Sequence, residues 1–430
     1  MGTSITTTEL SNGLSVSLKE IHNAPLISSW LWYRVGSKDE STGITGVSHW
    51  TEHMQFKGTP QYPSAVLDKV IARQGGYWNA FTFLDWTTYF ETMPAGKIDL
   101  ALQLEADRMT NSMFDPAEVE LERTVIISER QGSENEPLFK LGEEVQAAAY
   151  RVHPYHHSII GDMADLQTIT RDDLYHHYRT YYTPENAVLA IAGDFKSDEM
   201  LDRIRELFEP IPDGVEPPRL NRAEPPQPGE KRLTVEGPGE TSYVQAAYRA
   251  PAGGDGDFFP CIVLDSLLTG PSSLNMFGGG ISNKTSRLYR ALVEGELAVN
   301  VSGGLPATVE PFLYSIVLTV HPQKSSQEVI TVLEDEIKRL QDAPPPAEEV
   351  ARAVKQARAL FAYGSESISN QAFWMGYTEM FATYDWFEGY LDKLAAVTPQ
   401  DVQQMAQTYL RPQNRVLGTY LPIGNNQVPS

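Results

Sequence analysis

The chain has 430 residues, of which 41% are hydrophobic and 10% are aromatic. That length exceeds what one hydrophobic core supports, because cores stop growing at about 250–300 residues, and the composition is too apolar for a disordered chain. The 56 acidic residues outnumber the 34 basic ones and give a formal charge of -22, which repels phosphate backbones and anionic lipid headgroups. We therefore expect at least two folded domains, with neither nucleic acid nor a membrane as partner.

The first segment, Met1–Glu20, alternates polar and apolar residues and lacks the apolar core of a signal peptide. No apolar run in the sequence approaches the ~20 residues that span a bilayer. Cys261 is the sole cysteine, which excludes an intrachain disulfide and a thiolate metal cluster. We expect a cytoplasmic protein, and a cleaved export signal stays open as the alternative.

The segment Gly46–Gly58 contains a candidate metal site. In a helix, His49 and His53 stand one turn apart on the same face, with roughly 5–6 Å between their Cβ atoms, so both imidazoles can converge on one ion. Glu52 projects to that face too. The order His-x-x-Glu-His reverses the His-Glu-x-x-His zinc motif and places a carboxylate beside the metal as a candidate general base. Because short patterns also match by chance, a polar helix face is the alternative.

A catalytic zinc ion needs a third protein ligand and an open position for water. The stretch Glu122–Glu129 supplies a candidate, since the seven-residue spacing puts both acids on one helical face two turns apart. We assign Glu129 as the third ligand and Glu122 as the residue that orients a ligand through a hydrogen bond. Without the histidine motif, an exposed acidic helix would be the preferred interpretation.

Seven prolines lie between Pro210 and Pro228, and this density excludes helix and central strand and predicts a semi-rigid linker at residues 216–230. The sequences on either side resemble each other, because the block Thr170–Asn186 recurs as Thr398–Asn414 at a constant offset of 228 residues. Each copy has a Thr N-cap, an amphipathic helix, a proline and an apolar strand. We therefore predict an N-terminal zinc-binding domain at 1–215 and a homologous C-terminal domain without a metal site at 231–430.

Strand-like and helix-like runs are interspersed in both halves. Examples of the first are Leu14–Leu18, Ile27–Val35 and Tyr243–Arg249, and examples of the second are Pro63–Gln74 and Ser325–Leu340. Adjacent strands suggest hairpins more than alternating βαβ units. The predicted fold class is α+β, with helices layered on a mostly antiparallel sheet in each domain.

The motifs resemble those of the pitrilysin-type inverzincin metallopeptidases, and among them the mitochondrial processing peptidase and its bacterial relatives. In that family a glutamate ligand follows the inverted motif at a fixed distance, and here Glu129 stands 76 residues after His53. The resemblance extends over nearly the whole chain, with further matching landmarks at His153–Tyr155, Tyr181–Asn186 and Ser286–Tyr289. It implies a zinc endopeptidase with Zn²⁺ as cofactor and Glu52 as the base.

The segment Gly75–Tyr89 looks like the part of the family fold whose edge strand binds substrate. The resemblance implies that Trp78, Asn79 and Ala80 hold a peptide by strand addition, in which main-chain hydrogen bonds supply affinity. It also implies short or unstructured peptides as substrates.

The chain departs from the family in its C-terminal half. Active single-chain relatives carry an Arg and, seven residues later, a Tyr that stabilise the tetrahedral intermediate. Here Val293 and Val299 occupy those places, allowing for a one-residue gap, and neither can donate a hydrogen bond to an oxyanion. We expect a homologous partner subunit to supply the Arg and Tyr in a shared chamber, with a homodimer as the fallback. The alternative function is a non-catalytic structural subunit, because core subunits of respiratory complexes share this fold.

Overall fold

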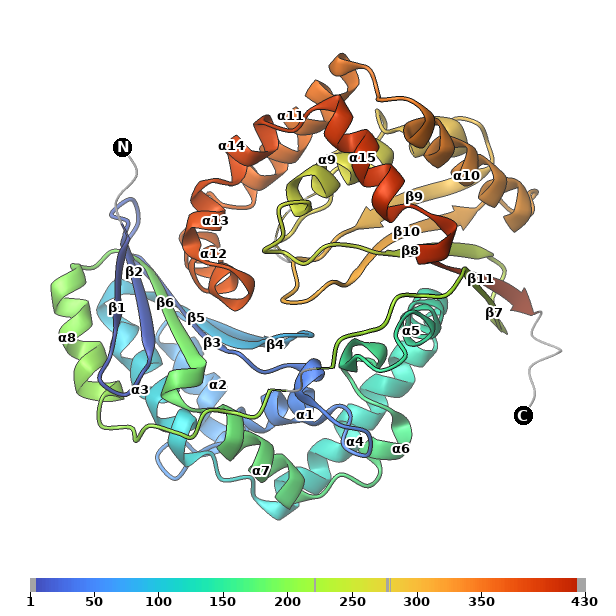
Figure 1. Ribbon diagram of the computed structural model, residues 1–430. Coiled ribbons are helices and arrows are strands. Elements are labelled where there is room, and N and C mark those ends of the chain that lie inside the picture. Colours follow the sequence, from blue (N-terminus) through green and yellow to red (C-terminus); the bar gives the residue numbers. More distant parts are fainter. Residues whose placement is uncertain (1–4, 220–221, 276–277, 279, 424–430) are drawn as a thin grey trace. The chain divides into compact units, whose positions relative to one another are not determined.

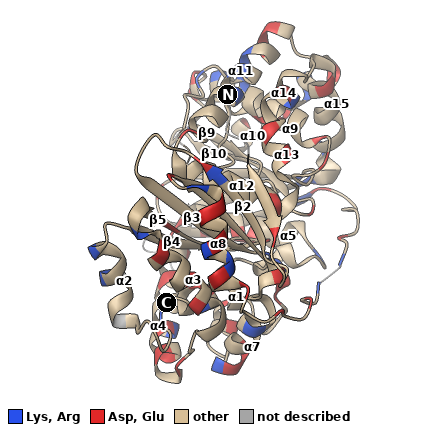
Figure 2. Ribbon diagram, turned by 90° about the vertical axis from the view of Figure 1, so that its left-hand side faces the viewer, with Lys and Arg blue, Asp and Glu red and all other residues tan. Residues whose placement is uncertain are grey.

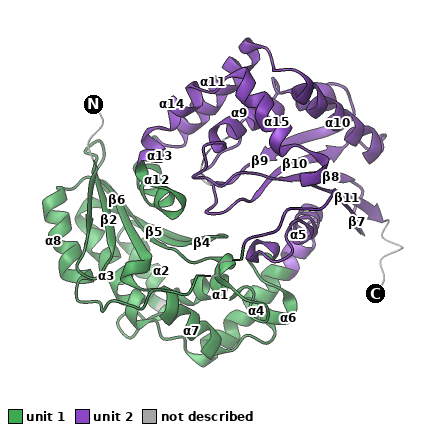
Figure 3. Ribbon diagram, in the orientation of Figure 1, with its two compact units in different colours: residues 1–130, 157–222, 366–384 green, residues 131–156, 223–365, 385–430 purple. Residues whose placement is uncertain are grey.

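The computed structural model describes residues 5–219, 222–275, 278 and 280–423. The chain forms two compact units, which are coloured separately in Figure 3. Unit 1 holds residues 1–130, 157–222 and 366–384, and unit 2 holds residues 131–156, 223–365 and 385–430. Each unit contains its own sheet, with helices packed on it (Figure 1).

Unit 1 is built on a six-stranded sheet with the strand order β1-β2-β6-β3-β5-β4. Strands β2 and β6 run parallel, and the other neighbouring pairs are antiparallel. The central strand β3 is buried along nearly its whole length, as its apolar and aromatic composition predicts. The strands are β1 Thr6–Glu9, β2 Ser15–Glu20, β3 Leu26–Tyr33, β4 Tyr77–Thr82, β5 Thr87–Pro94 and β6 Ala187–Gly193.

Helices cover both faces of this sheet. Helix α12 packs on β3 and β6, while α1, α2, α3 and α8 contact the sheet from the other side (Figure 1). Gly376 allows α12 to approach closely, since a Cβ at that position would lie 2.1 Å from the Trp32 indole nitrogen. The helices are α1 Val47–Met54, α2 Ser64–Arg73, α3 Ile98–Asn111, α4 Pro116–Glu134, α6 Met163–Leu166, α7 Arg171–Tyr181, α8 Ser197–Phe208 and α12 Ile368–Phe381.

Unit 2 repeats the topology of unit 1 without the first strand. Its sheet has the order β7-β11-β8-β10-β9, in which β7 and β11 run parallel and the other pairs are antiparallel. These strands correspond in order to β2, β6, β3, β5 and β4. Their bounds are β7 Lys231–Pro238, β8 Tyr243–Arg249, β9 Ala298–Gly304, β10 Leu313–Val320 and β11 Arg415–Ile423.

Helix α5 packs on β7, β8 and β11 of unit 2, much as α12 packs on the sheet of unit 1. Helix α5 comes from the N-terminal half of the sequence and α12 from the C-terminal half. The helices of unit 2 are α5 Pro137–Ala149, α9 Phe258–Leu268, α10 Ser326–Asp342, α11 Ala347–Tyr363, α14 Tyr390–Ala395 and α15 Pro399–Tyr409, and α13 Tyr384–Glu388 begins at the boundary between the units.

The predicted fold class is confirmed, with two homologous domains that each carry helices on a mostly antiparallel sheet. The repeated block forms the same local structure twice, because Thr170 and Thr398 each cap a helix through a capping box. The described residues between α8 and β7 contain neither helix nor strand. The boundaries 1–215, 216–230 and 231–430 remain a prediction, and the compact units cross them at residues 131–156 and 366–384.

Acidic residues are spread over many elements, and basic residues lie among them (Figure 2). In the described part of the chain, no helix combines the length and the apolar composition that crossing a bilayer requires.

Candidate metal centre

Helix α1 carries the His-x-x-Glu-His motif and begins directly after Gly46, whose φ of 88° is left-handed. A Cβ at Gly46 would also lie 2.5 Å from the Ile160 carbonyl oxygen, so this position requires glycine. The Glu40 carboxylate accepts hydrogen bonds from the backbone N–H groups of Gly46 and Ser48, both at 2.8 Å, and so pairs donors that a helix start leaves open. His157 Nε2 lies 3.0 Å from the same carboxylate. The Glu40 carboxylate therefore fixes the start of α1 through these hydrogen bonds.

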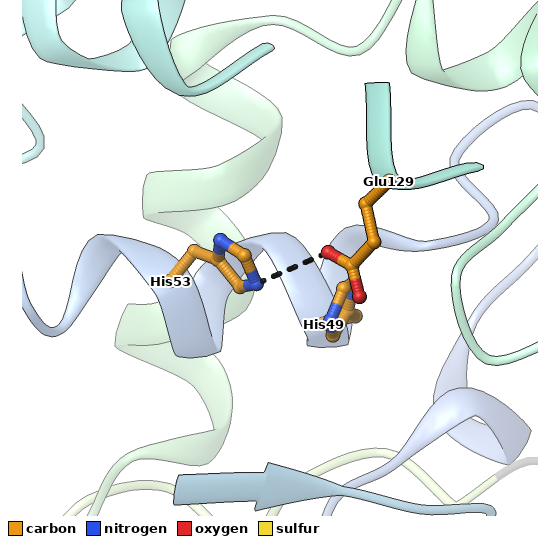
Figure 4. Close-up of side chains that lie close together, drawn as sticks. All are labelled: His49, His53 and Glu129. Carbon is orange, nitrogen blue, oxygen red and sulfur yellow. Dashed lines mark ion pairs between the residues drawn. The ribbon is translucent and has the colours of Figure 1, made fainter. Parts of the chain in front are cut away.

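The structure brings the three predicted ligands, His49, His53 and Glu129, together (Figure 4). Each offers one ligand atom, and these atoms lie within 4.8 Å of one another. The two imidazole rings project from α1 with their centroids 4.6 Å apart. Glu129 comes from α4, and its Oε2 lies 3.8 Å from His53 Nε2. Among the described residues, no other trio of His, Cys, Asp or Glu side chains converges in this way.

Glu122, predicted to orient a ligand, contacts His53. Its Oε1 lies 2.8 Å from His53 Nδ1, an arrangement that leaves Nε2 to face Glu129. Lys57 forms an ion pair with the other oxygen of Glu122. Burial alone would raise the pKa of Glu122, but the hydrogen bonds to His53 and Lys57 outweigh it and lower that pKa. Glu122 is therefore held as a carboxylate that accepts a hydrogen bond from the imidazole.

The two histidines differ in their affinity for protons. Burial, reinforced by the neighbouring His53, lowers the pKa of His49 to about 3, so His49 is neutral near pH 7 and keeps a lone pair for a metal ion. Burial also acts to lower the pKa of His53, but the hydrogen bond to Glu122 and the charges of Glu52, Glu122 and Glu129 raise it overall. Metal binding at His53 therefore competes with a proton.

These residues fit a catalytic zinc ion. Two imidazoles and one carboxylate form one of the ligand sets that leave a fourth position open for water. His49 Nδ1 is buried and has no hydrogen-bond partner among the described residues, and such an unpaired buried group calls for an explanation such as a bound ion. The Glu129 side chain is half-exposed, so its carboxylate would be free to adjust to a bound ion.

Glu52, the predicted base, is buried on α1 next to His53 and is 8% exposed. Thr82 Oγ1 donates a hydrogen bond of 2.7 Å to Glu52 Oε2. Burial raises the pKa of Glu52 to about 7, although the Thr82 hydrogen bond and the nearby His53 oppose the rise. A carboxyl group that titrates near neutral pH is well matched to accepting and returning a proton.

The predicted substrate-binding residues lie on β4, an edge strand of the unit 1 sheet. In the described part of the chain, β4 pairs with β5 alone. Trp78 packs against Phe56, with ring centroids 4.6 Å apart, while Asn79 is exposed and Ala80 is buried. Asn79 Oδ1 accepts a hydrogen bond of 2.9 Å from the Ala80 N–H. Peptide binding at this edge remains a prediction.

The two valines at the expected Arg and Tyr positions belong to unit 2. Val293 ends the π-helical turn Tyr289–Val293, and Val299 is 56% exposed on β9. A partner chain that supplies the missing donors remains a prediction.

The sequence did not predict three contacts of the site. Lys57 pairs with Glu122, Thr82 donates to Glu52, and Glu40 accepts hydrogen bonds from the start of α1. Lys57 lies beyond Met54, the last residue of α1, so the helical period does not indicate its contact with Glu122. Thr82 lies 30 residues from Glu52, and no local pattern indicates that pairing.

Two family models match the chain in succession. The model described as Insulinase (Peptidase family M16) matches residues 15–163, and the model described as Peptidase M16 inactive domain matches residues 168–357. The first range includes the proposed metal ligands and the base, and the second includes Val293 and Val299.

Individual proteins match as well. The Zinc protease PqqE of Helicobacter pylori is 33% identical over 248 residues, which cover 56% of this chain and 56% of that protein. A probable mitochondrial-processing peptidase subunit beta of Arabidopsis thaliana is 33% identical over 201 residues, covering 47% of this chain and 38% of that protein. These alignments span about half or less of the two relatives' own lengths. The crystal structure of a protease from Helicobacter pylori has a TM-score of 0.91 at 25% identity and covers 98% of this chain and 100% of that chain.

The fold and the site together define a two-unit α+β protein whose first unit brings a His-x-x-Glu-His helix and a distant glutamate together. The chain belongs to peptidase family M16. The predicted family resemblance is thereby confirmed.

Proposed function

We propose that this chain is the zinc-bearing subunit of an endopeptidase that hydrolyses short or unstructured peptides. The observation that carries the proposal is the convergence of His49, His53 and Glu129 from two helices, beside the buried Glu52. The names of the relatives, zinc protease and mitochondrial-processing peptidase, support the same class of activity.

In this proposal His49, His53 and Glu129 hold the ion, and Glu122 orients His53 through Nδ1. A bound zinc ion would supply Lewis acidity and lower the pKa of a water molecule to about 7. Glu52 accepts a proton from the attacking water and delivers it to the leaving amine. Burial of Glu52 limits its contact with bulk water, which keeps the proton available for that transfer.

An unstructured peptide suits the open side of β4, because it can add as a further strand through its main chain. Most of the main chain of a folded protein is already hydrogen-bonded within its own structure and cannot add in this way. Val293 and Val299 have no polar group to stabilise an oxyanion, so we propose that a homologous subunit contributes an Arg and a Tyr inside a shared chamber.

The activity is tested with an unstructured peptide that carries a fluorophore and a quencher. We expect zinc-loaded protein, alone or with its partner, to cleave the peptide, a chelator to stop cleavage, and added zinc to restore it. A stably folded protein of similar sequence composition serves as the control and should stay intact. Absence of chelator-sensitive cleavage by both the lone chain and the mixture would contradict the proposal.

The partner is tested by mixing the purified chain with a homologous chain encoded by a neighbouring gene. Loss of oxyanion-hole donors costs about 10²–10³-fold in kcat, so we expect the mixture to exceed the lone chain by a factor of that order. Full activity of the lone monomer would contradict the heterodimer. Weak activity that rises with self-association would instead indicate a homodimer.

A second candidate is a non-catalytic structural subunit, which the description of the second family model as an inactive domain favours. That model matches residues 168–357 and does not include His49, His53, Glu52 or Glu129. A stable complex with a homologous chain but no chelator-sensitive hydrolysis would favour this second candidate.

A further inference from the structure

Thr82 connects the proposed substrate strand to the proposed base. It is the last residue of β4, and its Oγ1 lies 2.7 Å from Glu52 Oε2. The threonine hydroxyl is the donor and the carboxylate oxygen the acceptor. Thr87 Oγ1, the other side-chain oxygen near this hydroxyl, is more distant at 3.4 Å.

The Glu52 carboxylate depends on this contact for its orientation. Among the described residues, Thr82 is the one side chain that forms a hydrogen bond with it. A glutamate side chain has three rotatable bonds, so an otherwise unbonded carboxylate would occupy several orientations. A bond to Oε2 restricts that rotation, and no described side chain forms a hydrogen bond with Oε1, which is left to face the attacking water.

We infer that Thr82 is a positioning residue that orients the Glu52 carboxylate for proton transfer. The inference rests on the proposed function and adds a residue to it. Thr82 follows Ala80 by two residues on the same strand, so peptide docking along β4 and alignment of the base depend on one element. Displacement of a reacting group by about 1 Å can cost 10²-fold in rate, which is why one hydroxyl can matter here.

The test compares Thr82→Val, which removes the hydroxyl and keeps the branched shape, with Thr82→Ser, which keeps the hydroxyl. We expect Thr82→Val to lower kcat by roughly 10- to 100-fold, with KM within about twofold because the side chain does not hold the peptide. Thr82→Ser should restore most of the activity. Equal kcat values for Thr82→Val and the unmodified protein would overturn the inference.

Thr88→Val is the matched control. Thr88 lies on the neighbouring strand β5, is fully buried, and donates its hydroxyl to the Leu31 carbonyl oxygen at 3.1 Å, not to Glu52. This substitution removes a comparable hydroxyl from the same sheet and should leave kcat unchanged. A fall in kcat as large as that of Thr82→Val would show that any lost hydroxyl disturbs the sheet, and would overturn the inference.

Two readouts do not depend on activity. Zinc affinity, measured by competition with a chelator, should be the same in Thr82→Val as in the unmodified protein, because the hydrogen bonds of the Thr82 side chain to described residues go to Glu52 and Thr87 and not to a proposed ligand. The melting temperatures of metal-free Thr82→Val, Glu52→Ala and the double variant should be non-additive, as expected for residues in contact. Additive shifts would overturn the contact itself. If the unmodified protein shows no chelator-sensitive hydrolysis, the proposed function fails. The melting temperatures of the two single variants and the double variant still decide whether Thr82 and Glu52 interact.

Discussion

Helices α1 and α9 occupy equivalent places in the two units, since each follows the central strand of its sheet, β3 or β8. Helix α1 presents His49, Glu52 and His53. Helix α9 buries every residue except the half-buried Pro260, and its sequence is almost entirely apolar. One position in a duplicated fold is therefore used for packing in one unit and for a candidate metal site in the other, which shows that function depends on the site and not on the fold.

The buried polar side chains of the two helices differ in whether they have hydrogen-bond partners. Asp265 of α9 accepts hydrogen bonds from Thr269 Oγ1 at 2.6 Å and Ser272 Oγ at 2.5 Å, so its burial is compensated locally. His49 of α1 has no hydrogen-bond partner for its buried Nδ1 among the described residues. The contrast separates a buried polar group whose partners lie in its own unit from one whose buried nitrogen the described residues leave without a hydrogen bond.

The largest expected difference between the two helices is catalytic. Glu52→Gln keeps the shape of the side chain but removes the base, so we expect kcat to fall by about 10²–10⁴-fold while zinc stays bound. Peptide hydrolysis and metal analysis on the same samples measure both quantities. Cys261→Ala in α9 is the control and should leave kcat unchanged. Equal turnover by Glu52→Gln and the unmodified protein would contradict the role of α1.

The next largest effect concerns the hydrogen bond by which Glu122 orients the proposed ligand His53. Glu122→Gln weakens the hydrogen bond that orients His53, and loss of such a partner costs about 10- to 100-fold in metal affinity. Competition with a chromophoric chelator measures the change. Glu118→Gln, one turn earlier on α4, tests the general effect of removing a charge and should leave the affinity near that of the unmodified protein. Equal losses in both variants would mean that only the overall charge matters.

The helices α12 and α5, each packed on one sheet, provide a comparison of stability. A Cβ at Gly376 of α12 would lie 2.1 Å from the Trp32 ring, so Gly376→Ala should lower the free energy of unfolding by about 1–3 kcal/mol through overpacking. A Cβ at Gly142 of α5 would meet just Gln245 Oε1 at 3.7 Å, so Gly142→Ala should be neutral or stabilise by up to about 1 kcal/mol. Denaturant midpoints measure both. Destabilisation of the same size in both variants would contradict this difference in packing.

The smallest expected effect concerns the start of α1 and its dependence on pH. Burial acts to lower the pKa of His157, but the hydrogen bond to Glu40 and the charges of Glu40 and Asp162 raise it overall. The native state then binds this proton more tightly than the unfolded chain. The stabilisation is fully present below the ordinary histidine pKa of about 6.5 and is lost as the pH rises through the folded value. His157→Gln should flatten that decline in denaturation midpoints, and an unchanged slope would contradict the prediction.

The sequence predicted those features that follow a local period. The spacing of His49, Glu52 and His53 identifies one helical face, and the N-caps at Thr170 and Thr398 mark the repeated helices. The exchange of α5 and α12 between the sheets was not predictable, because an amphipathic pattern shows that a helix buries one face but not which sheet covers it. The Thr82 contact with Glu52 depends on the tertiary fold in the same way.

The most direct test of the account is the zinc content of the purified chain after dialysis against zinc. We expect one zinc ion per chain in the unmodified protein and in His321→Ala, which removes the sole histidine of residues 231–430. We expect His49→Ala and His53→Ala to bind none. Zinc retained by both of these variants, or no zinc in the unmodified protein, would contradict the assignment of α1 as the metal-binding helix.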